Sequence, residues 1–413
     1  MNSSVENISD PLETRVAVAG DSVRGVFPRV VVEPRDDVEV GALLKDANAS
    51  GLAVLPRGGG TKLDWGNRPR RADMVLSTAR LNRVVEHAWA DLTVTVQAGC
   101  TIRTLQDTLH VHGQRVAVDP LWPDRATVGG VLSTNDTGAL RLRFGGLRDL
   151  VIGLTLALPD GTLASSGGKV VKNVAGYDLS KLATGALGTL GVITRAVFRL
   201  HPLPQQARTW SAAFTSLPEA LRLVDAIQDS KLAHTSLQVR VSSASPPAVD
   251  MLLEGSAAGI ASQALQARAL AGGTALEESS AAVWSAREDL WSPGERGPVV
   301  KISVPLTEVV KTVEIVQRVA GAEHLTWEAV IQATGLGWIR FDGTPATWSA
   351  VIGPLRSAAE REGGSLVILR PPLPEDPCDA WGDIGDAQPL MTAVKRQFDP
   401  KSTLNPGRFV GGI

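Results

Sequence analysis

The chain has 413 residues, of which 44% are hydrophobic, and a formal net charge of −2 at pH 7. A chain of this length forms two or three domains, and a near-balanced charge without long basic or acidic runs argues against a nucleic-acid-binding surface. The only two cysteines, Cys100 and Cys378, exclude a disulfide framework and an iron–sulfur cluster ligated by this chain alone.

The first twelve residues, MNSSVENISDPL, are polar, and we expect them to be disordered. They lack the basic start and apolar core of a secretory signal, and no apolar run approaches the roughly 20 residues needed to cross a bilayer. We therefore expect a cytoplasmic location. The alternative is the inner face of the cell membrane, if the chain is held there as part of a complex.

The first half of the chain, residues 1–205, alternates short helices and strands and ends at HPLP (201–204), a natural linker. Apolar residues at helical spacing predict helices, and polar–apolar alternation predicts half-buried strands. The expected helices are 37–48 and 100–113, and the expected strands include 52–56, 91–99 and 191–200.

The second half, residues 206–395, is predicted to form a separate cap domain. SLPE (216–219) is a capping box that opens a helix to about residue 230, between strands at 209–214 and 236–242. An Ala/Ser-rich stretch, 243–283, gives no clear element. The remainder predicts β-α-β-β-α-β, the pattern of a ferredoxin-like sandwich, over 298–304, 306–320, 327–333, 336–341, 346–362 and 365–370. The last segment, 396–413, is expected to return to the first domain.

Three consecutive glycines in PRGGGTKLDWGN (56–67) raise the question of what this loop binds. Backbone N–H groups without a neighbouring Cβ form a concave site for anionic oxygens. The segment lacks the helical period of a Rossmann fingerprint, and the spacing of a P-loop is absent. A structural glycine turn is the other explanation. Two further Gly/Thr-rich segments, 126–138 and 185–194, favour a dinucleotide site built by three converging loops.

Five segments, in chain order, resemble the vanillyl-alcohol-oxidase-like (PCMH-type) FAD-linked oxidase family. Within that family, the end of the chain and LVILRPP (366–372) are similar to the E-type FAD-binding subunits of bacterial glycolate oxidase. The resemblance covers nearly the whole chain and implies an α+β fold: a PCMH-type FAD-binding domain of two α+β subdomains plus a ferredoxin-like cap. The five segments are PRGGGTKL (56–63), TVGGVLSTN (127–135), KNVAGYDLSKL (172–182), GTLGVIT (188–194) and FDPKSTLNPGRF (398–409).

The resemblance also implies where FAD binds. The glycine loop would wrap the diphosphate, the second loop would lie nearer the ribityl chain and ring, and the third loop and the C-terminal segment would complete the site. Because no histidine lies in the glycine loop, non-covalent FAD is expected. The implied residues are Arg57, Gly58, Gly59, Gly60, Thr61, Lys62, Pro120, Thr127, Gly129, Gly130, Thr134, Gly138, Gly191, Val192, Ile193 and Asn405.

Other matching residues have structural alternatives. Lys172, Asn173, Tyr177 and Asp178 match a family motif, and a buried Tyr–Asp hydrogen bond would explain them equally well. Arg340 and Arg370, on predicted cap strands, could clamp a carboxylate, although surface cations are the interpretation we favour. Trp284 and Trp291, seven residues apart, are expected to belong to a core or an interface.

The resemblance implies an FAD-dependent oxidoreductase acting on CH–OH donors, converting glycolate or D-lactate to 2-oxo acids. Its partners would be a larger D-type FAD subunit and an iron–sulfur subunit. Catalytic relatives hold substrate with a His-rich metal site, but VIQATGLGWIRF (330–341) contains no histidine. We therefore expect no metal and an electron-relay or assembly role, with catalytic residues unassigned. The alternatives are a stand-alone 2-hydroxy-acid dehydrogenase and a structural subunit with FAD as a folding ligand.

Overall fold

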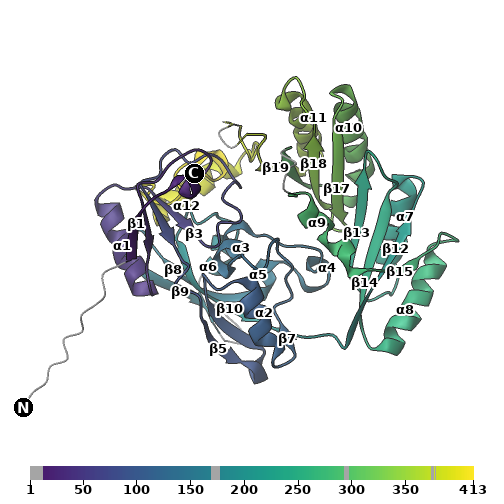
Figure 1. Cartoon of the computed structure of the whole chain (residues 1–413), viewed down its shortest axis with the longest axis horizontal. Helices are drawn as coiled ribbons and strands as arrows, with labels where there is room; N and C mark the ends of the chain where they lie inside the picture. Colours follow the sequence, from purple (N-terminus) through teal and green to yellow (C-terminus); the bar gives the residue numbers. More distant parts are fainter. Residues whose placement is uncertain (1–12, 169–176, 293–296, 374–375, 377) are drawn as a thin grey trace, which may run out of the picture.

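The computed structural model describes residues 13–168, 177–292, 297–373, 376 and 378–413. The expected disorder of residues 1–12 therefore lies outside the described residues. Figure 1 shows an N-terminal body built on two small sheets, and beside it a second body formed by one large sheet with helices. The described residues contain no helix that is long and apolar enough to cross a membrane.

The first subdomain is a four-stranded sheet in the order β1-β2-β4-β3, in which β2, β4 and β3 run parallel. Helix α1 covers it and is capped at its N-terminus by Asp36, whose carboxylate accepts the Glu39 backbone N–H at 2.9 Å. Its buried residues Val40 and Leu44 pack against Val54 and Leu76 of the sheet. The elements are β1 (Glu13–Val16), η1 (Ala19–Asp21), β2 (Val30–Glu33), α1 (Asp37–Ala49), β3 (Val54–Arg57) and β4 (Met74–Ser77).

The second subdomain is an antiparallel sheet in the order β5-β6-β10-β8-β9, packed against short helices. Ile102, Leu105 and Leu109 of α2 are buried in its core, as their helical spacing predicts. The elements are β5 (Val84–Ala88), η2 (Trp89–Asp91), β6 (Thr93–Gln97), α2 (Ile102–His110), β7 (Gln114–Arg115), α3 (Val128–Thr134), α4 (Arg141–Phe144), α5 (Leu147–Leu150), β8 (Val151–Ala157), β9 (Leu163–Gly167), α6 (Leu179–Ala183), β10 (Val192–Arg199) and β11 (His201–Pro202).

The cap is one antiparallel sheet of eight strands in the order β15-β12-β14-β13-β17-β18-β16-β19. Each half of it is a β-α-β-β-α-β unit, and the halves join where β13 pairs with β17, with Gln238 opposite Gln332. The first half contains β12 (Gln206–Ala213), α7 (Leu217–Gln228), β13 (His234–Ser242), β14 (Ala248–Gly255), α8 (Ala257–Leu270) and β15 (Glu277–Ser279). After η3 (Ala281–Ser285) and α9 (Ala286–Asp289), the second contains β16 (Val299–Ser303), η4 (Leu306–Glu308), α10 (Val309–Ala322), β17 (Thr326–Gln332), β18 (Leu336–Asp342), α11 (Trp348–Arg361) and β19 (Ser365–Arg370).

The α+β fold class with a ferredoxin-like cap is confirmed, but the sequence revealed only the second of the two ferredoxin-like units. The Ala/Ser-rich stretch 243–283 forms β14, α8 and β15. Helix α8 shows little periodicity because its buried positions, apart from Ile260, are the alanines Ala264 and Ala267. Small residues on both faces remove the polar–apolar contrast that predicts a helix.

The two faces of the cap sheet differ. One packs on α7, α8, α10 and α11 and forms the largest core of the described residues. The other carries Lys301 and Trp338, which lie directly opposite each other on β16 and β18. Trp338 packs with Trp65 and Leu121 of the first domain, so this second face looks towards that domain.

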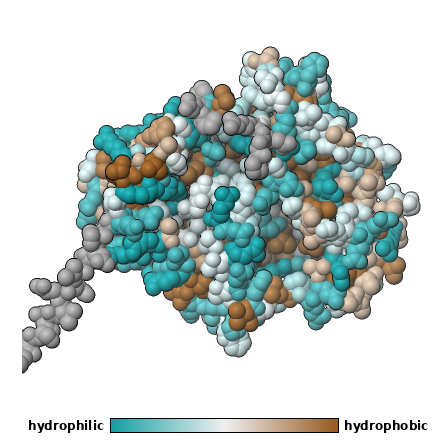
Figure 2. Space-filling view, in the orientation of Figure 1, coloured by the Kyte–Doolittle hydropathy of each residue, from teal (hydrophilic) through white to brown (hydrophobic). Residues whose placement is uncertain are grey.

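The end of the chain returns to the first domain. After α12 (Ala387–Phe398), the Val54 N–H donates to the Thr403 carbonyl at 2.8 Å, and the Asn405 N–H donates to the Val54 carbonyl at 3.0 Å. The short helix η5 (Val410–Gly412) ends the chain. Figure 1 shows this yellow segment beside the purple strands. The outer surface seen in Figure 2 is mostly hydrophilic, with hydrophobic residues in scattered patches.

Candidate functional site

The glycine loop follows β3 and lies in close contact with the loop that precedes α3. A Cβ added at Gly58 would lie 2.0 Å from Thr127 Oγ1, and one at Gly59 would lie 1.8 Å from the Arg125 carbonyl oxygen. Both distances are far below van der Waals contact, so only glycine permits this approach of the two loops. The glycines therefore form a wall made of backbone.

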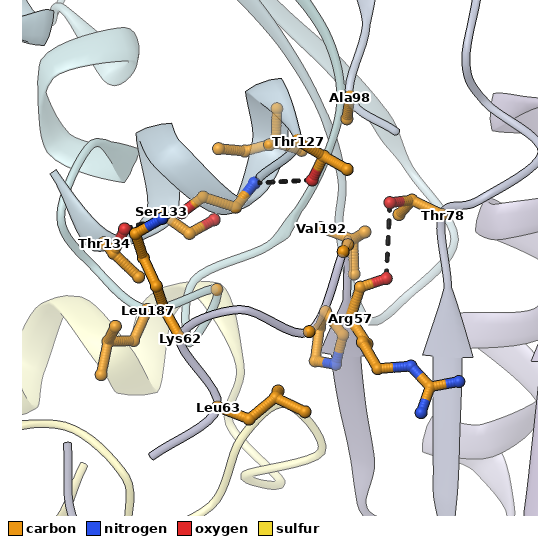
Figure 3. Close-up of a pocket in the computed structure, with 18 of the residues that line it drawn as sticks. Arg57, Lys62, Leu63, Thr78, Ala98, Thr127, Ser133, Thr134, Leu187 and Val192 are labelled. Carbon is orange, nitrogen blue, oxygen red and sulfur yellow. Dashed lines mark hydrogen bonds between the residues drawn. The ribbon is translucent and has the colours of Figure 1, made fainter. Parts of the chain in front are cut away.

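The second loop forms the opposite wall and continues into α3. Thr127 caps this helix, since its Oγ1 accepts the Gly130 backbone N–H at 3.4 Å, as Figure 3 shows. Position 129 also requires glycine, because a Cβ there would lie 2.8 Å from the Cβ of Ala98. Close approach of α3 to the sheet leaves one continuous pocket between the two glycine-rich loops.

The structure brings fourteen of the sixteen predicted cofactor residues to this single pocket (Figure 3). Pro120 and Gly138 do not line it. They line a neighbouring cavity next to the cap, where the Gly138 N–H donates to the Asp119 carboxylate at 3.0 Å. The fourteen are Arg57, Gly58, Gly59, Gly60, Thr61, Lys62, Thr127, Gly129, Gly130, Thr134, Gly191, Val192, Ile193 and Asn405.

Asn405 supplies a buried polar group that lacks a partner in the pocket wall. Its Nδ2 donates to the Leu187 carbonyl at 2.5 Å, whereas its Oδ1 has no hydrogen-bond partner among the described residues. The residue is 2% exposed and has a φ of +44°, a left-handed conformation that asparagine tolerates better than most residues. A buried acceptor without a donor is unfavourable, so this position favours a bound molecule that carries an N–H or O–H group. FAD carries both, in its ring and its hydroxyl groups.

A buried lysine fixes the backbone around Asn405. Lys395 Nζ donates to Asp399 at 2.6 Å, to the Thr189 carbonyl at 2.7 Å and to the Leu404 carbonyl at 3.1 Å. Burial lowers the pKa of Lys395, and Asp399 opposes that effect. One ammonium group thus holds the third glycine-rich loop and the returning tail together on the pocket wall.

The two cationic side chains of the glycine loop are both engaged in ion pairs. Arg57 Nη1 lies 2.6 Å from the carboxylate of the buried residue Asp21, and Figure 3 shows its guanidinium turned away from Lys62 and α3. The carboxylate of Asp21 also binds Arg15, and hydrogen bonding to Arg15 is the main cause of its strongly lowered pKa. The backbone of residues 58–61, rather than the Arg57 side chain, therefore faces the pocket.

Lys62 extends from the pocket wall towards the cap. Its Nζ lies 3.2 Å from Asp136 Oδ2, donates to the Leu121 carbonyl at 3.3 Å, and lies 5.8 Å and 5.3 Å from the ring centres of Trp65 and Trp122. Burial lowers the pKa of Lys62, and the charge of Asp136 opposes this. Cation–π contacts in a desolvated site add to the stabilisation of the ammonium group.

Asp136 forms ion pairs with a cation from each of the two domains. Its other oxygen, Oδ1, lies 3.1 Å from Arg287 Nη1 of the cap. Arg287 also donates to the Thr137 and Asp119 carbonyls, at 2.6 and 3.1 Å. Burial alone would raise the pKa of Asp136, but Arg287 and Lys62 together hold it below its usual value. Lys62, Asp136 and Arg287, named here the ion triad, join the pocket wall to the cap.

Four of the ten tryptophans gather around the ion triad. Trp65, Trp122, Trp291 and Trp338 belong to one apolar cluster between the domains. Trp122 and Trp291 meet edge to face with ring centres 5.7 Å apart. The ring of Trp338 lies 4.8 Å from the Arg287 guanidinium carbon. The tryptophans therefore surround the buried charges and limit the access of water.

Lys301 lies on the same face of the cap sheet as Trp338. Burial lowers its pKa to about 8, although the charge of Asp136 raises it. Within the described parts of the chain, its ammonium group has no ion-pair or hydrogen-bond partner. The Trp338 Nε1–H, opposite it on β18, is also buried without a partner there. This face thus offers an unpaired cation and an unpaired N–H donor.

Asp136, Arg287 and Lys301 were not predicted as site residues. A single lysine within the otherwise apolar strand PVVKISV (298–304) was a usable signal, because an alternating strand places it on one face with other buried residues. Arg287 and Asp136 carried no comparable local signal. Their roles come from a contact across 151 positions of the chain.

The two cap arginines differ from what the sequence predicted. Arg340 is not a surface cation: it is 5% exposed and pairs with Asp342 and Glu328. Arg370 is half-buried and donates to the Gly297 and Leu290 carbonyls, so neither guanidinium stands ready as a substrate clamp.

The buried Tyr–Asp bond is also wrong, since Tyr177 is 93% exposed and Asp178 caps α6. Lys172 and Asn173 lie outside the described residues. In contrast, Trp291 packs in the interface between the domains, as expected, and Trp284 donates to Thr209 on β12. Among the described residues, no group of three or more His, Cys, Asp or Glu side chains could hold a metal ion.

The glycine-walled pocket with its buried unpaired acceptor is the candidate site for a dinucleotide cofactor. Residues 28–167 match the profile of a family described as "FAD binding domain". The match assigns an FAD-binding domain to this part of the chain, and FAD is its cofactor, as the resemblance predicted.

Two curated relatives are the glycolate oxidase subunit GlcD of Bacillus subtilis and a D-lactate dehydrogenase of Archaeoglobus fulgidus. GlcD is 32% identical over 238 residues, which cover 57% of this chain and 51% of that protein. The dehydrogenase is 38% identical over 196 residues, covering 47% and 44%. The chain thus spans about half the length of these relatives. Among solved structures, an alkyldihydroxyacetonephosphate synthase has a TM-score of 0.72 at 17% identity, over 93% of this chain and 77% of that one, which shows a shared fold.

Proposed function

We propose that this chain is an FAD-dependent oxidoreductase that acts on 2-hydroxy acids such as glycolate or D-lactate and gives the 2-oxo acids. The observation that carries the proposal is the pocket of three glycine-rich loops with the unpaired Asn405 Oδ1 in its wall. The names of the relatives support the substrate class, because they include a glycolate oxidase subunit and a D-lactate dehydrogenase.

The proposed FAD site is the pocket lined by the fourteen residues named above, without a covalent bond. The backbone of residues 58–61 would hold the diphosphate, and Asn405 would accept a hydrogen bond from the cofactor. Bound FAD supplies the acceptor for the two electrons of an alcohol oxidation. We also propose the division into an FAD domain (1–205), a cap (206–395) and a returning tail (396–413).

The cap face contributes an anion site in this proposal. A 2-hydroxy acid carries a carboxylate, and Lys301 offers a partly buried ammonium group without a described partner. Pairing a carboxylate with this ammonium and the Trp338 N–H would satisfy both groups. The surrounding tryptophans would keep water away from that pair, which strengthens it in a site of low dielectric constant.

The sequence supports a subunit role, since the cap segment 330–341 contains no histidine. We propose that the chain relays electrons or supports assembly in a glycolate-oxidase-type complex with a D-type FAD subunit and an iron–sulfur subunit. Such a complex would be cytoplasmic or would lie at the inner face of the membrane. A stand-alone dehydrogenase is the second candidate, and the unpaired Lys301 is the observation that favours it.

Anaerobic titration of the FAD-loaded chain with glycolate and with D-lactate tests these roles, with bleaching of the flavin absorption as the readout. Bleaching by the chain alone establishes its own substrate site. In that case Lys301→Met should raise the half-saturating substrate concentration at least tenfold, while the exposed-surface control Lys311→Met should not. FAD that stays oxidised until a D-type subunit is added indicates a relay.

A complex that assembles and works equally well without FAD in this chain would leave only a structural role. A purified chain that binds no FAD would refute the site itself.

A further inference from the structure

The ion triad carries an excess of positive charge next to the proposed flavin pocket. Lys62 and Arg287 are cations, Asp136 is the one carboxylate between them, and their side chains are 3%, 8% and 1% exposed. With Asp136 ionised, the triad therefore has a net charge of +1 in a nearly dry environment. Asp119 lies nearby, but burial raises the pKa of its carboxyl group, which weakens its contribution as a second counter-charge.

Lys62 places part of the positive charge of the ion triad in the wall of the pocket. Lys62 follows the glycine loop directly and lines the same pocket as Gly58, Gly59 and Asn405. Figure 3 shows its side chain along the side of the pocket where α3 lies. Trp65 and Trp122 cover the ammonium group, so solvent screens its field little.

We propose that the ion triad sets the reduction potential of the bound FAD by favouring its reduced form. Two-electron reduction adds negative charge to the flavin ring, and a buried net positive charge in the pocket wall stabilises that charge electrostatically. Asp136 limits the effect by neutralising one of the two cations. The inference rests on the proposed location of FAD in this pocket.

A purely structural role for the triad, as an ion pair between the domains, makes a different prediction. Both Lys62→Met and Asp136→Asn would then destabilise the site, because each change removes a buried ion pair. An electrostatic role requires opposite shifts of the potential, since Lys62→Met lowers the net charge and Asp136→Asn raises it. The sign of the two shifts therefore separates the explanations.

The experiment is equilibrium reduction of the FAD-loaded full chain against a redox dye at pH 6, because burial lowers the pKa of Lys62 and a lower pH favours its charged form. Lys62→Met should lower the equilibrium constant for FAD reduction at least tenfold, about 30 mV for a two-electron couple, and Asp136→Asn should raise it. Lys62→Arg should stay near the wild-type value, as should the control Lys311→Met, a lysine of α10 whose side chain is 56% exposed.

Shifts of the same sign, or no shift in either variant with FAD bound, would overturn the proposal. If Lys62→Met does not retain FAD, Asp136→Asn decides alone: a rise supports the proposal and an unchanged value overturns it. FAD content and the absorption spectrum are measured in every preparation. A wild-type chain without FAD would refute the proposed site rather than its electrostatics, so the two failures are distinguishable.

Discussion

The contact between the two glycine-rich loops can be tested by adding a single methyl group at Gly59. In Gly59→Ala, the new Cβ would lie 1.8 Å from the Arg125 carbonyl oxygen, about 1.6 Å inside the distance at which ordinary contact begins. The atom it meets belongs to the backbone and cannot rotate away, so the loops must separate. Overpacking of this kind costs about 1–3 kcal/mol. If FAD binds only when the two loops are in their original contact, binding must overcome this strain. The dissociation constant of FAD then rises roughly 5- to 150-fold.

The assay is titration of the FAD-free chain with FAD, followed by quenching of flavin fluorescence. Gly321→Ala is the matched control, because it makes the same chemical change in α10, where a new Cβ meets nothing within 4 Å. The control should bind FAD like the wild type and gain stability, since alanine is the better helix former. Binding of FAD by Gly59→Ala within twofold of the wild type would show that FAD does not lie between these loops.

Three further changes test other parts of the site. Asn405→Gly keeps the positive φ but removes the amide, and should weaken FAD binding about tenfold in the same titration. Asp399→Asn leaves the buried Lys395 without its counter-ion and should lower the free energy of unfolding in urea by about 3–5 kcal/mol. Burial lowers the pKa of Lys301 to about 8 from 10.5, so the unfolded chain holds this proton more tightly than the folded one. Stability should therefore rise between about pH 8 and 10.5, and Lys301→Met should reduce that rise; an unchanged pH profile would contradict the reasoning.

Much of the fold was predictable because its signals are local. Helix α1 has an acidic cap and a glycine stop, and the strands of the second ferredoxin-like unit alternate regularly. The first ferredoxin-like unit was missed because α8 buries mainly alanines, whose small side chains give no amphipathic pattern. The duplication of the cap therefore became visible only from the strand order.

In the candidate site, too, some residues have a local signal in the sequence and others depend on contacts between distant parts of the chain. Gly58 and Gly59 are required by their close contact with the loop before α3, and three glycines in a row are a local signal for such a special loop. Asp136 instead owes its role to Lys62 and Arg287, which lie far from it in the chain and on two different domains. No spacing rule predicts such a contact, because Arg287 reaches Asp136 only when the cap has packed against the first domain.

This difference bears on how the proposed functions are divided within the chain. Apart from Arg57, which pairs with Asp21, and Lys62, the residues that would hold FAD form an uncharged wall of backbone and small side chains that is suited to binding. The charges that would act on the flavin and on a substrate anion, Lys62, Arg287 and Lys301, gather where the cap meets that wall. Variants of the loops should therefore change FAD affinity first. Variants of the charged residues should change the potential or substrate binding while FAD remains bound.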